Sequence, residues 1–145
     1  MQRQYALKAL GFYTGAIDGK FGQNSREAVR AFQRAIGTPG TGELEPAEIV
    51  ALIGEAARSG DRDCQTIYGG MFATGAGVAK DLPRSVEWYR RAAEAGNGFG
   101  QLNLGYAYAN GWGVQRDVVS ARRWLEAARD NGVPEAAQAL RTMGN

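Results

Sequence analysis

The chain has 145 residues, of which 44% are hydrophobic and 22% are charged, and this length fits one ordinary domain or two small ones. It has no histidine and a single cysteine, Cys64, which excludes an internal disulfide, a His-based triad and the common zinc sites. The net charge of +2 is spread evenly, because residues 1–58 carry seven basic and six acidic side chains and residues 59–145 carry ten and nine. This balance argues against a nucleic-acid partner.

The sequence also excludes several other classes of protein. No apolar run approaches the roughly 20 residues that a membrane span needs. Met1 leads almost at once into a helical pattern, so we see no signal peptide, and we expect any export signal to lie outside this chain, as it would in a fragment of a longer protein. A glycosidase needs two carboxyl groups across a cleft, whereas Glu43 and Glu45 lie on a predicted turn. We therefore expect no catalysis, no metal and no other cofactor.

The first 58 residues predict three short helices. Leu7 and Leu10 indicate a first helix that stops at Gly11. A Gly-rich turn region follows, and Asn24 or Ser25 is expected to cap a second helix. The apolar face of this second helix comprises Ala28, Val29, Phe32 and Ile36. Pro46 suits the first turn of a third helix, whose apolar face comprises Ile49, Leu52, Ile53 and Ala56.

The second half of the chain repeats itself with a period of 36 residues. When residues 61–96 are shifted onto 97–132, ten positions are identical: Gln65/Gln101, Gly69/Gly105, Ala73/Ala109, Gly75/Gly111, Gly77/Gly113, Val78/Val114, Asp81/Asp117, Trp88/Trp124, Ala92/Ala128 and Gly96/Gly132. Each unit predicts two helices joined by a turn. Pro134 to Met143 begins a third unit that has one helix. The prediction is a helix-turn-helix solenoid over residues 61–145, with units 61–96 and 97–132 and a terminal helix in 133–145.

Most of the repeated residues have a structural role. Gly75 and Gly111 are expected to end the first helix of each unit in a left-handed conformation. Asp81 and Asp117 are placed to cap the second helix, whose packed face includes Trp88 and Trp124. Gly69 and Gly105 lie inside the first helix, where glycine costs about 1 kcal/mol against alanine. Close contact between two helices would justify that cost.

Residues 1–54 resemble the bacterial peptidoglycan-binding domain of the three-helix type. The matching residues are Ala6–Leu10, the loop Gly11-Phe-Tyr-Thr-Gly-Ala-Ile-Asp-Gly-Lys-Phe-Gly22, then Ser25, Ala28-Val29, Phe32-Gln33, Gly37, Gly42–Ala47 and Leu52. The sequence departs from the family pattern at Arg3, where leucine is usual, and at Glu48, where a hydroxyl residue is common.

Residues 61–145 resemble Sel1-type repeats, a TPR-like family of helix pairs. The matching residues are Leu104-Gly-Tyr-Ala-Tyr108, Gly111-Trp-Gly-Val114, Asp117, Ala121, Trp124-Leu125 and Ala127-Ala128. Together the two resemblances imply an all-α protein of the bacterial periplasm or cell envelope, with a three-helix domain at 1–58 that binds peptidoglycan. The repeats at 61–145 would then bind a protein partner. An alternative is a pure protein–protein interaction scaffold, in which the N-terminal bundle only caps the solenoid.

The resemblance places a candidate peptidoglycan site on the Gly-rich loop and the start of the second helix. A site for this polymer needs an aromatic surface, hydrogen-bond donors and one or two cations. Asp18, Phe21 and Asn24 also have structural explanations as a turn residue, a core residue and a helix cap, and Arg26 belongs to a basic stripe with Arg30 and Arg34 that suits a solvated helix face. The candidates are Tyr13, Asp18, Lys20, Phe21, Gln23, Asn24 and Arg26.

Four aromatic residues of the repeats are candidates for the protein partner. Phe72 and Tyr108 occupy the same position in successive units, and Tyr106 and Trp112 are further large aromatics in the second unit. The alternative for Phe72 and Tyr108 is packing between helices. Trp112 lies in a loop between two glycines and has no helical packing role. Trp88 and Trp124 are expected in the core.

Overall fold

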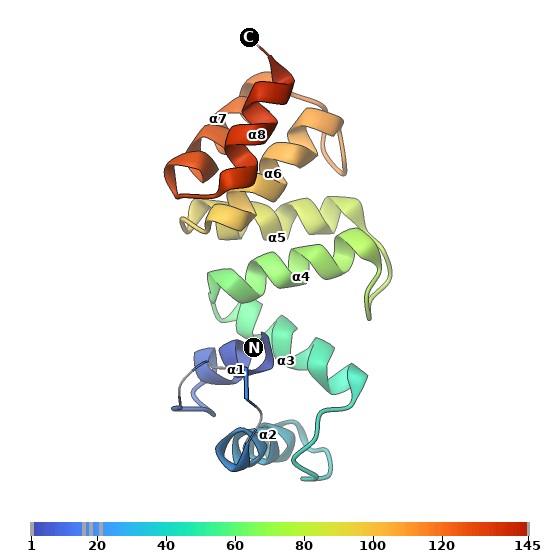
Figure 1. Cartoon of the computed structure of the whole chain (residues 1–145). Helices are drawn as coiled ribbons and strands as arrows, with labels where there is room; N and C mark the ends of the chain where they lie inside the picture. The colour runs from blue at the N-terminus through green and yellow to red at the C-terminus, as the bar shows by residue number, and fades with distance from the viewer. Residues whose placement is uncertain (1, 16, 18, 21, 145) are drawn as a thin grey trace. The chain divides into compact units, whose positions relative to one another are not determined.

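The computed structural model describes residues 2–15, 17, 19–20 and 22–144, with only the backbone of Tyr5. The described residues form eight α-helices and no strand, which confirms the all-α prediction (Figure 1). The chain divides into two compact units, residues 1–64 and 65–145. No helix of the described part is long and apolar enough to cross a bilayer.

The first unit contains α1 (Gln2–Ala9), α2 (Gln23–Ile36) and α3 (Pro46–Arg58). Its core brings together Leu7 of α1, Phe32 of α2 and Leu52 of α3, each at most 1% exposed. Phe12, in the loop after α1, meets Phe32 edge to face with ring centroids 5.8 Å apart. The three predicted helices are therefore present, and their apolar faces share one small core.

The start and the end of α2 differ from the prediction. The helix begins at Gln23 with Gly22 at the N-cap position and no side-chain cap, so the expected cap at Asn24 or Ser25 is wrong. The hydroxyl of Ser25 is buried and accepts a hydrogen bond from Gln4 instead. Ile36 is 40% exposed, because it is the last residue of α2 and the chain turns away through the left-handed Gly37.

The start of α3 agrees with the prediction and adds a reciprocal cap. Pro46 is in the first turn, where its missing N–H leaves nothing unpaired. The Glu45 side chain accepts from the backbone of Glu48, and the Glu48 side chain accepts from the backbone N–H of Glu45. Glu48 therefore has a structural role at the position where the sequence departs from the family pattern.

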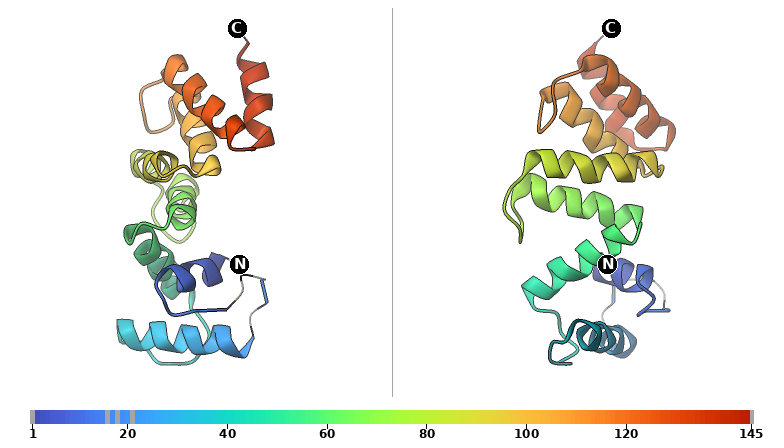
Figure 2. Two further views of the ribbon diagram at one scale, coloured as in Figure 1. Left: turned by 90° about the vertical axis from the view of Figure 1, so that its left-hand side faces the viewer. Right: turned by 180° about the vertical axis from the view of Figure 1, so that it is seen from behind.

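The second unit is the predicted solenoid. It contains α4 (Arg62–Thr74) from residue 65 onward, α5 (Leu82–Glu94), α6 (Gly98–Asn110), α7 (Val118–Asp130) and α8 (Pro134–Met143). The helices α4 and α5 lie side by side in both views of Figure 2, and α6 packs on α5 and α7. The terminal helix α8 buries Ala136 against Leu102 and Leu125.

The caps of the repeats are as predicted. Asp81 accepts a hydrogen bond from the backbone N–H of Arg84 at 3.0 Å, and Asp117 accepts one from Ser120 at 3.2 Å. Gly75 and Gly111 follow the first helix of the first and second repeat, with φ of 78° and 71°. Two sets of local signals, 36 residues apart in the sequence, therefore set the helix ends in the same way.

Gly69 and Gly105 lie at close helix contacts, as predicted. A Cβ at Gly69 would lie 2.8 Å from the ring of Tyr89 and 3.2 Å from the carbonyl oxygen of Ser85. A Cβ at Gly105 would lie 2.8 Å from Leu125 and 3.3 Å from the carbonyl oxygen of Ala121. Because glycine has no side chain, the two helices of each repeat can approach each other closely.

We predict opposite effects for alanine at two adjacent glycines of α4. Gly69→Ala should destabilise the second unit by about 1–2 kcal/mol, because the clash exceeds the gain in helix propensity. Gly70→Ala should stabilise it by up to about 1 kcal/mol, because a Cβ there would meet only the Tyr89 hydroxyl, at 3.6 Å. Urea unfolding followed by tryptophan fluorescence measures both, and a stabilised Gly69→Ala variant would contradict the close-contact explanation.

The two repeated tryptophans differ in burial. Trp88 is 8% exposed and meets the Tyr68 ring at 5.1 Å between centroids. Trp124 is only partly buried, so its expected place in the core is wrong in part. In the second repeat the position equivalent to Tyr68 is Leu104, and leucine has no ring that could pack against the indole.

Candidate functional site

A buried glutamine holds the Gly-rich loop of the first unit against α2. The Gln4 side chain is 1% exposed. Its amide nitrogen donates to the carbonyl oxygen of Lys20 at 2.8 Å and to the Ser25 hydroxyl at 3.2 Å. Its amide oxygen accepts from the N–H of Gly19 at 3.0 Å. One side chain from α1 therefore positions both the loop and the start of α2.

The structure sorts the predicted wall-binding residues into three groups. Lys20, Gln23, Asn24 and Arg26 are exposed, on the loop and on the first turn of α2. Tyr13 is 8% exposed and belongs to the core, so little of its ring is left for a ligand. Asp18 and Phe21 lie outside the described residues. The described residues of the surface next to the Gln4 clamp are therefore polar or basic, and little of the Tyr13 ring is exposed beside them.

A second buried glutamine holds the other loop of the first unit. Gln33 of α2 is fully buried. It donates to the Thr41 hydroxyl at 3.1 Å and to the carbonyl oxygen of Glu43 at 2.9 Å, and it accepts from the N–H of Gly42 at 3.0 Å. The two glutamine clamps are alike, but only the Gln4 clamp touches the candidate binding surface.

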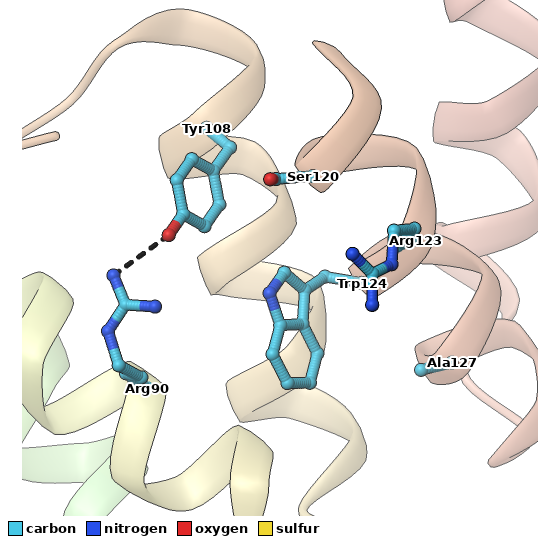
Figure 3. Close-up of a pocket in the computed structure, with 6 residues that line it drawn as sticks. All are labelled: Arg90, Tyr108, Ser120, Arg123, Trp124 and Ala127. Atoms are coloured by element: carbon cyan, nitrogen blue, oxygen red, sulfur yellow. Dashed lines mark hydrogen bonds between the residues drawn. The ribbon is translucent and has the colours of Figure 1, made fainter. Parts of the chain in front are cut away.

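The second unit has a pocket of about 390 Å³ between α5, α6 and α7 (Figure 3). It is lined by Arg90, Tyr108, Ser120, Arg123, Trp124 and Ala127. Arg90 donates to the Tyr108 hydroxyl at 2.8 Å, and its guanidinium carbon lies 5.6 Å from the centre of that ring. The indole of Trp124 stands across the pocket from Arg90 in Figure 3. The lining thus combines two cationic groups with an aromatic surface.

The four aromatics predicted to face a protein partner do not share one surface. Phe72 is buried at 5% exposure, and Tyr108 lines the pocket of Arg90 and Trp124. Tyr106 and Trp112 line a different and smaller pocket, of about 120 Å³. Residues two apart in a helix point to nearly opposite sides, since each residue turns by about 100°. Tyr106 and Tyr108 therefore cannot serve one contact surface.

Four residues that shape these sites were not predicted as site residues from the sequence. Gln4 and Gln33 are polar residues on the inner faces of helices, where a buried side chain must find hydrogen-bond partners. Arg90 and Arg123 come from different helices and are 33 positions apart in the chain. The difference between the two repeats is a signal for Arg123, because this arginine stands where the first repeat has Glu87.

Cys64 has no feature of a reactive thiol. Its side chain is fully buried. Burial, followed by the hydrogen bond with Asp61 and the charges of Asp61 and Asp63, raises the pKa of the thiol far above its ordinary value. Among the described residues, no group of three or more Cys, Asp or Glu side chains is arranged to hold a metal ion.

Comparison with protein families matches nearly all of the chain to two models. Residues 1–52 match the family described as "Putative peptidoglycan binding domain". Residues 62–97 and 98–133 match the Sel1 repeat. A comparison with curated proteins found no match.

Solved structures resemble the chain as well. A Sel1 repeat protein from Oxalobacter formigenes is 33% identical, with a TM-score of 0.69 over 81% of this chain and 34% of its own. A protective antigen with an SLR fold, present in uropathogenic Escherichia coli strains, is 28% identical, with a TM-score of 0.70 over 99% and 33%. The chain thus spans about a third of the length of these two proteins. Cysteine rich protein B of Helicobacter pylori, 19% identical with a TM-score of 0.66 over 95% of this chain and 96% of its own, shares the fold.

Proposed function

The chain belongs to two families in series, a peptidoglycan-binding domain at 1–52 followed by two Sel1 repeats at 62–133, and we propose from this premise that it is a non-catalytic adaptor of the bacterial cell envelope. The first unit holds peptidoglycan and the repeats hold a protein partner. The pairing of the two families is the observation that carries the proposal. A peptidoglycan-binding domain implies association with the cell envelope, and the periplasmic side is where that polymer is accessible.

The arrangement of the loop supports the wall-binding part. Binding is stronger when the contact groups are ordered before the ligand arrives. Gln4 links the backbone of Gly19 and Lys20 to Ser25 of α2, so these two loop residues have less conformational freedom to lose. We assign polymer contact to the four exposed residues of this surface: Lys20, Gln23, Asn24 and Arg26. Their donors suit the carboxylates and hydroxyls of peptidoglycan.

Sedimentation with purified sacculi tests the wall-binding part. The whole chain should sediment with the sacculi. Arg26→Ala should weaken this binding about tenfold, the effect of losing a charge-assisted hydrogen bond of roughly 1.5 kcal/mol. Arg34→Ala is the matched control, because Arg34 is exposed on the same helix and lies two turns further along α2.

The outcomes separate the two parts of the proposal. If the whole chain stays in the supernatant, the wall-binding part is wrong, and the interaction scaffold becomes the better explanation of the family pairing. If Arg26→Ala and Arg34→Ala bind like the unaltered chain, the binding surface lies elsewhere on the first unit. If Arg34→Ala weakens binding as much as Arg26→Ala, general charge rather than this surface accounts for sedimentation.

A further inference from the structure

The pocket between α5, α6 and α7 has two guanidinium groups, those of Arg90 and Arg123, in its lining. The ion pairs of the described part include Arg58 with Glu55 and Arg129 with Asp130. Neither includes Arg90 or Arg123, and the described lining of the pocket contains no carboxylate. Cations that line a pocket without an acid leave room for an anionic group of a ligand.

The acid that interacts electrostatically with Arg123 already has other partners. The pKa of Asp117 is lowered chiefly by the hydrogen bond from the Ser120 hydroxyl, then by the backbone N–H of Ser120, with a smaller effect of Arg123. The hydroxyl donates to Asp117 at 2.7 Å, and the N–H donates at 3.2 Å. Asp117 is therefore committed to capping α7, and Arg123 keeps donors for a ligand.

Arg90 is oriented before any ligand arrives. It is partly buried, it donates to the Tyr108 hydroxyl, and it lies over the Tyr108 ring. A guanidinium has five N–H donors, so one hydrogen bond to Tyr108 leaves the others for an acceptor. This contact holds the charge at the edge of the pocket, opposite the indole of Trp124 (Figure 3).

The equivalent positions in the first repeat have a different arrangement. There Tyr68 meets Phe72 and Trp88 edge to face, with centroid distances of 4.9 and 5.1 Å. The position of Arg123 is occupied by Glu87 and that of Tyr108 by Phe72. The first repeat has arginines at the positions of Ser120 and Ala127, and these, Arg84 and Arg91, lie over the rings of Phe72 and Trp88 at 5.2 and 4.5 Å. The combination of Arg123 with the Tyr108 hydroxyl therefore belongs to the second repeat and does not follow from the repeat fold itself.

We infer that this pocket binds a carboxylate-bearing segment of the protein partner, an acidic side chain with an apolar neighbour. The inference rests on the proposed function, since it assumes that the repeats hold a protein. Carboxylates of the segment accept hydrogen bonds from Arg90 and from Arg123, which lie on opposite sides of Trp124 (Figure 3), and the apolar neighbour packs on Trp124 and Ala127. A volume of about 390 Å³ accommodates one such pair of side chains, at the small end of ligand pockets.

Titration of the whole chain with two short peptides tests the inference. The probes are acetylated, amidated Glu-Leu-Glu and its uncharged counterpart Gln-Leu-Gln, each added to about 10 mM so that a millimolar Kd is measurable. The readout is the NMR signal of each tryptophan indole N–H, with that of Trp124 assigned from Trp124→Phe. Glu-Leu-Glu should shift the Trp124 signal saturably and leave Trp112 unchanged, and Gln-Leu-Gln should bind at least about tenfold more weakly.

Three variants show whether the two arginines act. Arg90→Gln and Arg123→Gln should each raise the Kd for Glu-Leu-Glu about fivefold to tenfold, the loss of one charge-assisted contact at a partly exposed site. Arg129→Gln is the control, because Arg129 is exposed on α7 and outside the pocket lining. Equal effects of Arg123→Gln and Arg129→Gln would show a general charge effect and overturn the inference.

The remaining outcomes distinguish this inference from the proposed function. Equal binding of both peptides at Trp124 overturns the carboxylate and leaves a peptide-binding repeat. No shift of Trp124 with either peptide overturns the pocket as the site, while sedimentation with sacculi still decides the wall-binding part. Tighter binding of a soluble muropeptide than of Glu-Leu-Glu at Trp124 overturns the assignment to a protein, because the occupant is then the wall polymer.

Discussion

Gly113→Ala is expected to destabilise the second unit by about 3–4 kcal/mol, the sum of a left-handed backbone penalty and a backbone clash. Gly113 has φ of +73°, and a Cβ there would collide with the carbonyl group of Leu82 and lie 2.8 Å from the nitrogen of Pro83. These are backbone atoms at the start of α5, so no side-chain rotation relieves the contact. The loop of the second repeat and the start of α5 would have to separate.

Urea unfolding followed by tryptophan fluorescence measures this loss in the whole chain. The three tryptophans, Trp88, Trp112 and Trp124, all lie in the second unit, so the signal reports that unit alone. Gly111→Ala is the matched control, because Gly111 has φ of +71° in the same loop but a Cβ there would come no closer than 3.5 Å to Arg116. It should lose only about 1–2 kcal/mol. Equal losses would show that the backbone clash does not contribute.

Gln4→Met is expected to destabilise the first unit by about 2–3 kcal/mol and also to weaken binding to sacculi. Methionine matches glutamine in size but cannot hydrogen-bond the N–H of Gly19 or the carbonyl oxygen of Lys20. These groups are partly buried, so leaving them unpaired has a cost. Without the clamp, the loop that carries Lys20 loses its fixed position against α2, and binding must then order it.

Gln33→Met separates the loss of stability from the loss of binding. Gln33 holds the Gly42 and Glu43 backbone in the same manner, so its variant should lose a similar 2–3 kcal/mol, roughly. Its loop is not part of the candidate surface, and sedimentation with sacculi should be retained. Hydrogen exchange of the amides of Val29 and Leu52, both fully buried, measures the stability of the first unit at the temperature of the binding assay. Equal losses of binding in the two variants would contradict a positioning role for Gln4.

Much of the fold could be predicted from short-range patterns. The caps at Asp81 and Asp117 are contacts between residues three positions apart, and the helix ends at Gly75 and Gly111 depend on backbone conformation at single residues. Each of these signals lies within a stretch of about ten residues, so it can be recognised without knowledge of the tertiary structure. The 36-residue shift then required that two stretches with the same signals adopt the same structure.

The expectations that failed depended on partners far away in the sequence. The cap expected at Asn24 or Ser25 was wrong because Ser25 pairs with Gln4, 21 residues earlier. The expectation of a buried Trp124 was wrong in part: it is partly buried against a cluster that includes Leu104 of another helix, where the first repeat has the ring of Tyr68. Tyr106 and Tyr108 look alike in the sequence, but the geometry of α6 sends them to different pockets.

The amino-acid sequence by itself determined the all-α class, the two repeats with their glycine contacts and caps, and the absence of histidine chemistry, since these depend on composition and on neighbours within one helix turn. The tertiary structure decided which polar side chains hold loops in place and which cations line the same pocket. Gln4 and Gln33 reach backbone groups of loops outside their own helices, and Arg90, Tyr108 and Trp124 converge from three helices. The physical reason is that helix periodicity determines the face of the helix on which a residue lies, whereas the packing of the helices determines which residues contact that face.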